Sequence, residues 1–474
     1  MIYTLFGILL GLLLLGLMMF LHELGHFLVG KKLGFKILEF NIFMGPTLLK
    51  RYKDGIRYAL RLVPIGASVA FAGEGDEGET DEVLRERLRE ESAAQRRQEQ
   101  ETGAGEELDL DQAAKLDPDD PSLFFNRPKW MRALVLLAGP LINIVSGLLA
   151  LVIFFSATGF AQLRVKSVEA DSLFARAQIP VGAELLELDG HRLRNNLDFS
   201  YYLRFASEGR LELSYRSPEG QVERRELNWD RVHNWRFGIR KDAAQEGMIV
   251  ASVDPAPDTA PADDARRGLK AGDQILRVAG QEASIESLLQ AAQASEGEAV
   301  KLELLREGER LELELRPFAQ EGLRPVGASF ELSHSFWEAL PYSWHYLGSI
   351  VRLTFDSIRQ IFTGGIAARD AVSGPVGVVS MISGVVTASQ ISWADRALQL
   401  VYLFALISIS LGIMNLLPIP PLDGFQLWVT AYEGLRGKSL SMKARQRFAV
   451  AGLVVIVALF VLGLFFDILR LSGI

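Results

Sequence analysis

Three ionisable side chains near the start of the chain have the spacing of a metal-binding pair with a catalytic base. They are His22, Glu23 and His26, in the run His-Glu-Leu-Gly-His. Residues four apart share one face of a helix, so both imidazoles can bind one metal ion. Glu23 lies about 100° round the helix from His22, where it can hold a water at the metal instead of ligating it. A carboxylate that takes a proton from such water generates a hydroxide nucleophile, so the pattern predicts metal-assisted hydrolysis.

A second run, NLLPIPPLDG over residues 415–424, offers a third ligand. A catalytic zinc site has three protein ligands and one open position. Since the chain has no cysteine, these ligands must be histidine or carboxylate. The prolines cannot continue a helix, and unwound backbone at membrane depth is tolerated only where it is buried in protein or lines a cavity. We therefore expect Asp423 to join His22 and His26 on Zn²⁺. Without the histidine pair, the run would be read as an exit loop that caps the next helix.

Both motifs lie in or beside long apolar segments, and a charged middle region separates these segments. Each of the four apolar runs is long enough to cross about 30 Å of hydrocarbon as a helix. They are residues 2–29, 133–158, 397–417 and 448–466. Basic residues cluster between the first and second runs and between the third and fourth, which predicts that these loops are cytosolic. Both termini and the segment between the second and third runs should then lie outside. The net charge of −8 and the lack of a basic face argue against nucleic acid as a partner.

The composition between these helices changes several times along the chain. In chain order, the expected segments are a first transmembrane helix with the histidine pair (1–30), a membrane-associated β element (36–73), an acidic, disordered cytosolic insert (74–122), a second transmembrane helix (131–158), two similar α+β units (162–243 and 244–318), an amphipathic interfacial helix (335–365), a third transmembrane helix with the proline-rich run (397–424) and a fourth transmembrane helix (446–468). The two α+β units share a turn–strand–turn–helix order and so indicate an internal duplication.

At these motifs the chain resembles the site-2 protease family of intramembrane zinc metalloproteases, and within it the bacterial regulator of sigma-E protease type. HELGH at His22 matches the HExxH of the family, and the run from Asn415 matches its NxxPxPxLDG. AGPLINIVSG at Ala138 matches the AGPxxN of the second span, and SGPVGVVSMI at Ser373 resembles the segment before the third span. The resemblance covers nearly the whole chain except the acidic insert.

The resemblance implies a fold class and a set of roles. The fold is an α-helical membrane protein with four transmembrane helices and a membrane-associated β-sheet, plus two α+β PDZ-like domains. His22, His26 and Asp423 are implied as zinc ligands and Glu23 as the general base. Asn415 is implied to hold the substrate backbone, with Pro418 and Pro420 beside it. One departure is Phe425, where many members have a second glycine, so the wall near the ligand should differ.

The resemblance also implies partners and a location. The substrate would be a single-span membrane protein, such as an anti-sigma factor, already trimmed by a site-1-type protease. The enzyme would span the bacterial inner membrane, with both termini and the PDZ-like domains on the periplasmic side. Those domains would exclude bulky substrates or bind an exposed C-terminus, for which Phe237-Gly238-Ile239 is a candidate carboxylate-binding turn.

Two other functional classes fit parts of the pattern. One is a non-proteolytic PDZ membrane scaffold with a structural metal, which would need no carboxylate at the position of Glu23. The other is a transporter, because ionisable residues inside spans often mark ion pathways. Transporters usually contain inverted repeats of their spans, and the four apolar runs show no such repeat.

Overall fold

The computed structural model describes residues 2–74, 119–170, 172–205, 209–229, 231–241, 247–253, 268–323, 326–363, 374–387, 392–438 and 440–472. Most of the expected acidic insert, together with Ser373, lies outside these residues. Contacts divide the chain into two compact units. One contains residues 1–158, 334–387 and 394–474, and the other contains residues 159–333 and 388–393.

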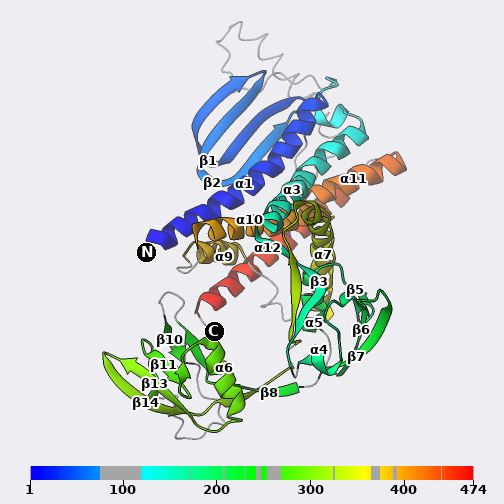
Figure 1. The fold of residues 1–474 in the computed structure, drawn as a ribbon. Helices are drawn as coiled ribbons and strands as arrows, with labels where there is room; N and C mark the ends of the chain where they lie inside the picture. The colour runs from blue at the N-terminus through cyan, green and yellow to red at the C-terminus, as the bar shows by residue number, and fades with distance from the viewer. Residues whose placement is uncertain are drawn as a thin grey trace. The chain divides into compact units, whose positions relative to one another are not determined.

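Long helices dominate the first unit (Figure 1). They are α1 (Ile2–Lys32), α3 (Lys129–Thr158), α7 (Phe336–Thr363), α9 (Pro375–Thr387), α10 (Trp393–Asn415), α11 (Asp423–Arg436) and α12 (Met442–Ser472). Four stretches within them are long and apolar enough to cross a membrane: Leu5–Lys32, Lys129–Thr158, Trp393–Asn415 and Lys443–Leu469. The prediction of four apolar helices of spanning length is therefore confirmed. The segment predicted as an interfacial helix forms α7, and its position at a membrane surface stays a prediction.

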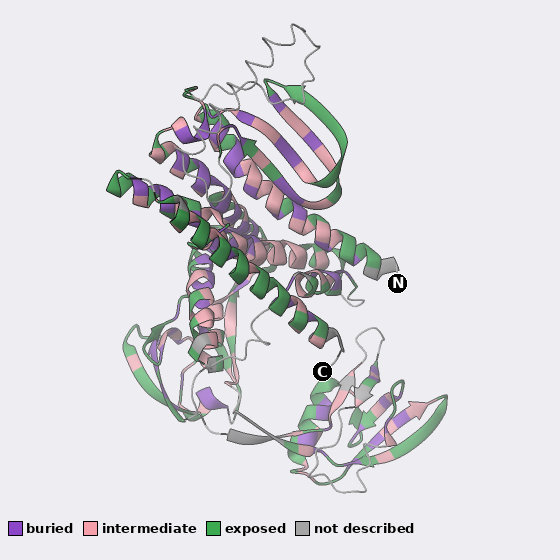
Figure 2. Ribbon diagram, turned by 180° about the vertical axis from the view of Figure 1, so that it is seen from behind, coloured by how far each residue is buried: buried purple, intermediate pink, exposed green. Residues whose placement is uncertain are grey.

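The helices expose apolar side chains over much of their surface. On α12 the exposed residues include Leu453, Val457, Phe460 and Val461, and Figure 2 shows this helix exposed along most of its length. In a water-soluble protein such a surface would be costly, because each buried large apolar side chain is worth about 1.5–3 kcal/mol. The exposed apolar faces therefore fit helices that are surrounded by lipid.

A two-strand sheet, β1 (Ile37–Lys53) with β2 (Ile56–Phe71), packs beside α1. Both strands bend, so that the segment containing Glu39 pairs with two neighbours, with Glu39 opposite Arg57 in one and opposite Ala70 in the other. The sheet is thus effectively four segments wide, in the order 47–53, 56–61, 37–42 and 67–71. Residues 67–71 form the edge whose Val69 backbone lies next to α1.

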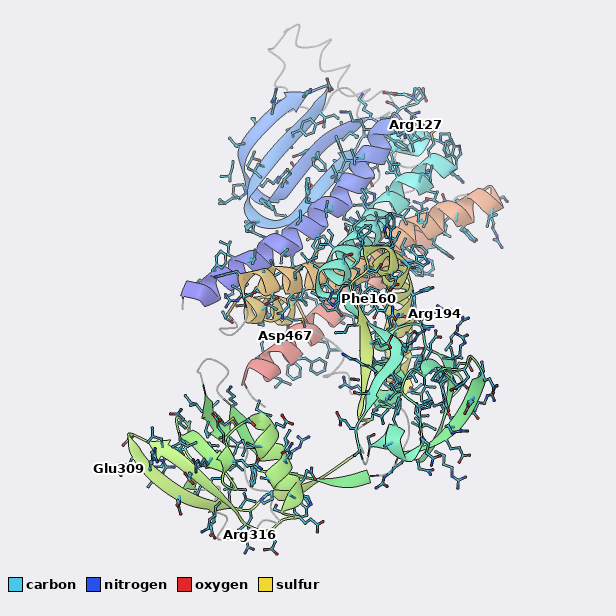
Figure 3. The ribbon with its side chains drawn as sticks, viewed as in Figure 1. Arg127, Phe160, Arg194, Glu309, Arg316 and Asp467 are labelled. Carbon is cyan, nitrogen blue, oxygen red and sulfur yellow. The ribbon has the colours of Figure 1, made fainter. Side chains whose placement is uncertain are left out.

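The short apolar helix α9 is fixed at its start by a carboxylate from α12. Asp467, labelled in Figure 3, accepts hydrogen bonds from the backbone N–H groups of Gly374 (3.0 Å) and Gly377 (2.8 Å). These donors belong to the first turn of the helix and have no partner within it. The buried Asp467 therefore satisfies the N-terminus of α9 and ties the segment that begins near Ser373 to the last helix.

The second unit contains two sheets of similar topology. In the first, the strand order is β16-β3-β4-β6-β7, with β5 paired to β4. These strands are β3 (Phe160–Val168), β4 (Glu184–Leu188), β5 (His191–Arg192), β6 (Gly209–Arg216), β7 (Val222–Trp229) and β16 (Ala328–Ser333). The short helix α4 (Leu173–Arg176) and the helix α5 (Asn196–Phe205) accompany this sheet. Its core is built from apolar residues that include Phe174, Leu213 and Leu227.

The second sheet has the order β14-β13-β11-β10-β9, with β12 paired to β11. Its elements are β9 (Ile239–Lys241), β10 (Met248–Val253), β11 (Gln274–Val278), β12 (Gln281–Glu282), α6 (Ile285–Ala294), β13 (Val300–Arg306) and β14 (Glu309–Leu315). In both sheets a small hairpin precedes a helix and a longer hairpin follows it, as the internal duplication predicted. A two-strand ribbon of β8 (Arg231–Arg236) and β15 (Phe318–Leu323) joins the two modules.

The boundary between the modules differs from the expected ranges 162–243 and 244–318. Residues 239–241 pair with β10 and so belong to the second sheet, whereas β16, after the second module, pairs with β3 and completes the first. The second module is therefore inserted into the first. The physical reason is that a strand pairs with whichever edge the fold brings beside it, however far apart the two lie in sequence.

A buried carboxylate, Asp273, paired with the partly exposed Arg306, closes the turn before β11. Asp273 is 1% exposed and receives two hydrogen bonds of 2.7 Å from the Arg306 guanidinium, with a third from the Lys270 backbone N–H (2.8 Å). The charge-assisted bonds from Arg306 hold the pKa of Asp273 below its usual range. These bonds fix the turn geometry, because Asp273 without Arg306 would be a buried charge with no opposite charge beside it.

Replacing Asp273 by alanine should destabilise the second module by about 1–3 kcal/mol, the cost of losing the hydrogen bonds to a buried carboxylate, because the partly exposed Arg306 can turn to water. Because the pKa is depressed in the fold, the stabilisation is complete above about pH 4 and is lost as pH falls below it. Hydrogen exchange of residues 274–306 in the full chain measures both effects. Exchange in the exposed-site control Glu312→Ala should match that of the unaltered chain, and an equally protected Asp273→Ala module would contradict the prediction.

Candidate metal centre

Three side chains from opposite ends of the chain converge in the first unit. His22 and His26 lie in the second half of α1, and Asp423 is the first residue of α11. The Asp423 Oδ2 atom lies 2.9 Å from His22 Nε2 and 3.4 Å from His26 Nε2. The two Nε2 atoms lie 3.2 Å apart. Among the described residues, these three side chains form the only group of His, Cys, Asp or Glu with this convergence.

The triangle of donor atoms has the dimensions of a tetrahedral zinc site. Zinc bonds of about 2.0–2.1 Å place neighbouring ligand atoms about 3.3–3.4 Å apart, close to the three separations above. Two imidazoles and one carboxylate are also a ligand set of catalytic zinc sites, which keep a fourth position open. Both histidines are buried, and the Asp423 side chain is 22% exposed. The residues present therefore fit a zinc ion that remains accessible on the side of the carboxylate.

The helix α3 fixes the orientation of His26. The Nδ1 atom of His26 donates to the backbone carbonyl of Val135 at 2.7 Å, which leaves Nε2 free for a metal. The helices approach closely at this point: a Cβ atom on Gly139 would lie 2.2 Å from His26 Nε2, and one on Gly25 would lie 2.4 Å from the Ala138 carbonyl oxygen. Any side chain larger than hydrogen at Gly139 would therefore displace the imidazole.

Backbone packing also places Asp423. The segment between α10 and α11 leaves helical geometry after Asn415, as its prolines require. A Cβ atom on Gly424 would lie 2.3 Å from the backbone of Leu416, so only glycine lets the start of α11 fold back onto the end of α10. Asp423 is then held at the first position of a helix, where a carboxylate is favoured by the helix dipole.

Glu23 lies beside the three donor atoms but is held by a different partner. Its Oε2 atom accepts a hydrogen bond from the backbone N–H of Val69 at 3.1 Å. Its carboxylate also interacts electrostatically with His26, His22 and Asp423. The side chain thus contacts the sheet edge formed by residues 67–71 and is near enough to the donor triangle to interact with its charges.

The structure places the remaining predicted site residues around the end of α10. Asn415 is the last residue of this helix and is half-buried, and Pro418 is exposed in the following segment. Pro420 is buried against Gly452 of α12. Phe425 is buried, with its ring 5.9 Å from that of Phe448, so the departure at this position fills a contact between α11 and α12.

Sequence reasoning left two neighbours of the site without a role. Gly139 and Asn143 lie one turn apart on α3, in the AGPLIN run, and the Asn143 side chain lies 3.3 Å from His22. The AGPLIN run is visible in the sequence, but the roles of its residues depend on which face of α3 packs against α1. That choice follows from helix packing, which the apolar pattern of α3 does not specify.

The model of Peptidase family M50 matches residues 10–459, which is most of the chain. The chain is 26% identical to the Regulator of sigma E protease of Haemophilus influenzae, with 95% of this chain and 96% of that protein covered. It is also 26% identical to the Regulator of sigma-E protease RseP of Escherichia coli, with 96% and 97% covered. The name of a third relative, from Xylella fastidiosa, contains the words zinc metalloprotease; it is 27% identical, with 94% and 95% covered.

Proposed function

The chain belongs to peptidase family M50, and from this premise we propose that it is an intramembrane zinc endopeptidase. It hydrolyses a peptide bond in or near the transmembrane segment of a single-span membrane protein. The observation that carries the proposal is that the donor atoms of His22, His26 and Asp423 lie 2.9–3.4 Å from one another, with both histidines on a helix apolar enough to cross a membrane. Relatives whose names describe sigma-E regulation and zinc metalloproteases support it.

His22, His26 and Asp423 would hold the zinc ion, which when bound polarises a substrate carbonyl and acidifies water. Glu23 acts as the general base. Its carboxylate takes a proton from the attacking water as the new C–O bond forms, and delivers a proton to the amine nitrogen as the C–N bond breaks. Its hydrogen bond to the Val69 N–H holds the carboxylate beside the donor triangle, so little reorganisation is needed before proton transfer.

The substrate would bind as a strand at the sheet edge formed by residues 67–71. A helical segment must unwind first, since its peptide groups are bonded within the helix. Residues 67–71 have no strand partner on their outer side among the described residues, and an edge of this kind binds extended peptides through main-chain hydrogen bonds. Because Val69 contacts Glu23, a strand added here would pass beside the base. Asn415, with Pro418 and Pro420, would bound the other side of the substrate.

The relatives named for sigma-E regulation suggest an anti-sigma factor as the substrate. That protein would already have been trimmed by a site-1-type protease. We place the enzyme in the bacterial inner membrane, with both termini and the second unit on the periplasmic side. The loops that join the first helix to the second and the third to the fourth are rich in basic residues, and such loops stay in the cytosol.

The test of the proposed function is co-expression with a trimmed single-span protein: the unaltered chain should cut it, and Glu23→Gln should not.

The second unit would act as a size filter made of two PDZ-like modules. Because β16 completes the first sheet, the unit to remove is residues 159–333 rather than the two expected ranges alone. A chain with this unit replaced by a glycine–serine linker should cut a substrate that still carries its outer domain, at a rate within about tenfold of that for the trimmed form. Immunoblots of membranes report both rates, and continued dependence on prior trimming would contradict the filter.

A groove in the second module supports a different role, binding of a newly exposed C-terminus. Phe237, Gly238 and Ile239 line a cavity of about 410 Å³, together with residues of α6 that include Leu288 and Leu289. Leu289→Glu puts a charge into this groove without shortening the unit. Slower cutting of trimmed substrate by this variant would favour peptide binding, whereas an unchanged rate would favour the filter alone.

A further inference from the structure

We propose that Asn143 is a positioning residue that holds the His22 imidazole in the tautomer needed for zinc. The inference rests on the proposed zinc site and names a residue to which no role has been assigned above. Asn143 lies in α3, is 0% exposed, and its amide Nδ2 atom lies 3.3 Å from His22 Nδ1. Its Oδ1 atom is buried and has no hydrogen-bond partner within the part of the chain that the structure describes.

The chemistry of a ligating imidazole decides which end of this amide must face the ring. The Nε2 atom of His22 is the atom that faces Asp423 and His26, so it must be unprotonated to bind a metal. The ring proton then resides on Nδ1, and Nδ1 becomes a donor. The Nδ2 group of Asn143 is also a donor and cannot satisfy it, whereas Oδ1 can.

A half-turn of the Asn143 amide exchanges Oδ1 and Nδ2, and the two orientations occupy nearly the same volume. With Oδ1 toward His22, the amide accepts from Nδ1–H and the buried oxygen gains a partner. A buried acceptor without a partner costs about 1–3 kcal/mol. Once Nε2 is a ligand, the Nδ1–H group of His22 and the Oδ1 atom of Asn143 therefore both favour this orientation. The amide therefore supports the neutral imidazole with Nε2 available.

The surroundings give the two histidines different kinds of support. His26 donates to the backbone carbonyl of Val135 at 2.7 Å, an acceptor that no side-chain substitution removes. The corresponding acceptor for His22 is a side chain, so its contribution can be tested directly. The main chain of Asn143 is itself fixed, because its carbonyl accepts from Ser408 Oγ of α10 at 2.9 Å and from Ser146 Oγ at 3.1 Å.

The experiment measures metal affinity rather than cleavage. The full chain in detergent is stripped of metal and titrated with Zn²⁺ against a chromogenic chelator. Asn143→Leu, which keeps the size but removes the acceptor, should weaken zinc binding about 10–100-fold, the effect of losing the partner of a ligating histidine. Asn143→Asp, which can only accept, should stay within a few-fold of the unaltered chain. Ser156→Ala, later in α3, removes a hydroxyl that donates only to the carbonyl of Val152 in the same helix, so it is the control and should bind zinc as the unaltered chain does.

A spectroscopic measurement adds an independent criterion. Cobalt bound to the unaltered chain should give the visible absorption of a tetrahedral ion, and Asn143→Asp should preserve this spectrum while Asn143→Leu changes it. Equal weakening by the Asp and Leu variants, or unchanged affinity in a folded Asn143→Leu chain, would overturn the proposal. Should the Leu variant not fold, the Asp variant decides alone, since a tenfold loss there contradicts the acceptor role. His22→Ala tests the zinc site separately from the role of Asn143. If that variant bound zinc as tightly as the unaltered chain, His22 would not be a ligand, and the proposed site itself would be wrong.

Discussion

Replacing Glu23 by glutamine should lower the rate of substrate cleavage by about 10³-fold and leave zinc affinity within about twofold, since a general base contributes about 10²–10⁴-fold. Glutamine has the same shape and keeps an oxygen that can accept from the Val69 N–H, as Glu23 does at 3.1 Å. It lacks the basic oxygen that takes a proton from water. The rate is measured with a trimmed single-span substrate in membranes, and zinc affinity by chelator competition.

The matched control for this substitution is Glu338→Gln. Glu338 is an exposed glutamate in the first turn of α7, so the same chemical change should leave both rate and zinc affinity as they are. If Glu23→Gln kept more than about a tenth of the activity, Glu23 would not be the base. Loss of zinc together with activity would instead assign Glu23 to the ligand set.

The same variant separates the competing classes of function. A PDZ scaffold with a structural metal needs no base, so Glu23→Gln would leave its partner binding intact and there would be no cleavage to lose. A transporter would respond in transport rather than in proteolysis. The contact of Glu23 with the backbone of the sheet edge already favours hydrolysis, because it places a carboxylate at the edge along which an extended peptide would lie.

Hydropathy and short-range spacing were sufficient to predict the four long apolar helices and the histidine pair, but not the shorter helices α9 and α11. Uninterrupted apolar runs that match the thickness of a bilayer are typical of membrane-spanning helices, and four helices of that kind are present. His22 and His26 share a helix face for geometric reasons alone. For these features, the information lies within a few turns of one helix, so the sequence contains it.

Long-range pairing was not predictable in the same way. The return of β16 to β3, across the whole second module, has no local signature, because strand patterning shows which residues alternate and not which edge they meet. The closing of the metal centre by Asp423 came from a motif and a family resemblance. The role of Asn143 required the packing of α3 against α1, which places one amide beside one imidazole.

Replacing Asp423 by alanine should weaken zinc binding at least about 100-fold and reduce cleavage to background. Structural zinc sites in small peptides are worth about 10–16 kcal/mol divided over four ligands, so one ligand accounts for about 3 kcal/mol, or roughly two powers of ten. The loss should be severe here because only the two imidazoles on a single helix would remain as ligands, with no carboxylate among them.

The conservative variant Asp423→Glu tests whether position matters as much as charge. A Cβ atom built on Gly424 would lie 2.3 Å from the backbone of Leu416. The start of α11 is therefore packed too closely against this segment to shift and accommodate the extra methylene of glutamate. We expect zinc affinity between that of the unaltered chain and that of Asp423→Ala, with cleavage reduced more than binding, because misplacement of about 1 Å can cost about 10²-fold in rate. Asp395→Asn, in the exposed first turn of α10, is the control. Zinc bound with full affinity by Asp423→Ala would show that another residue completes the site, and the proposed joining of the two ends of the chain at one ion would then be wrong.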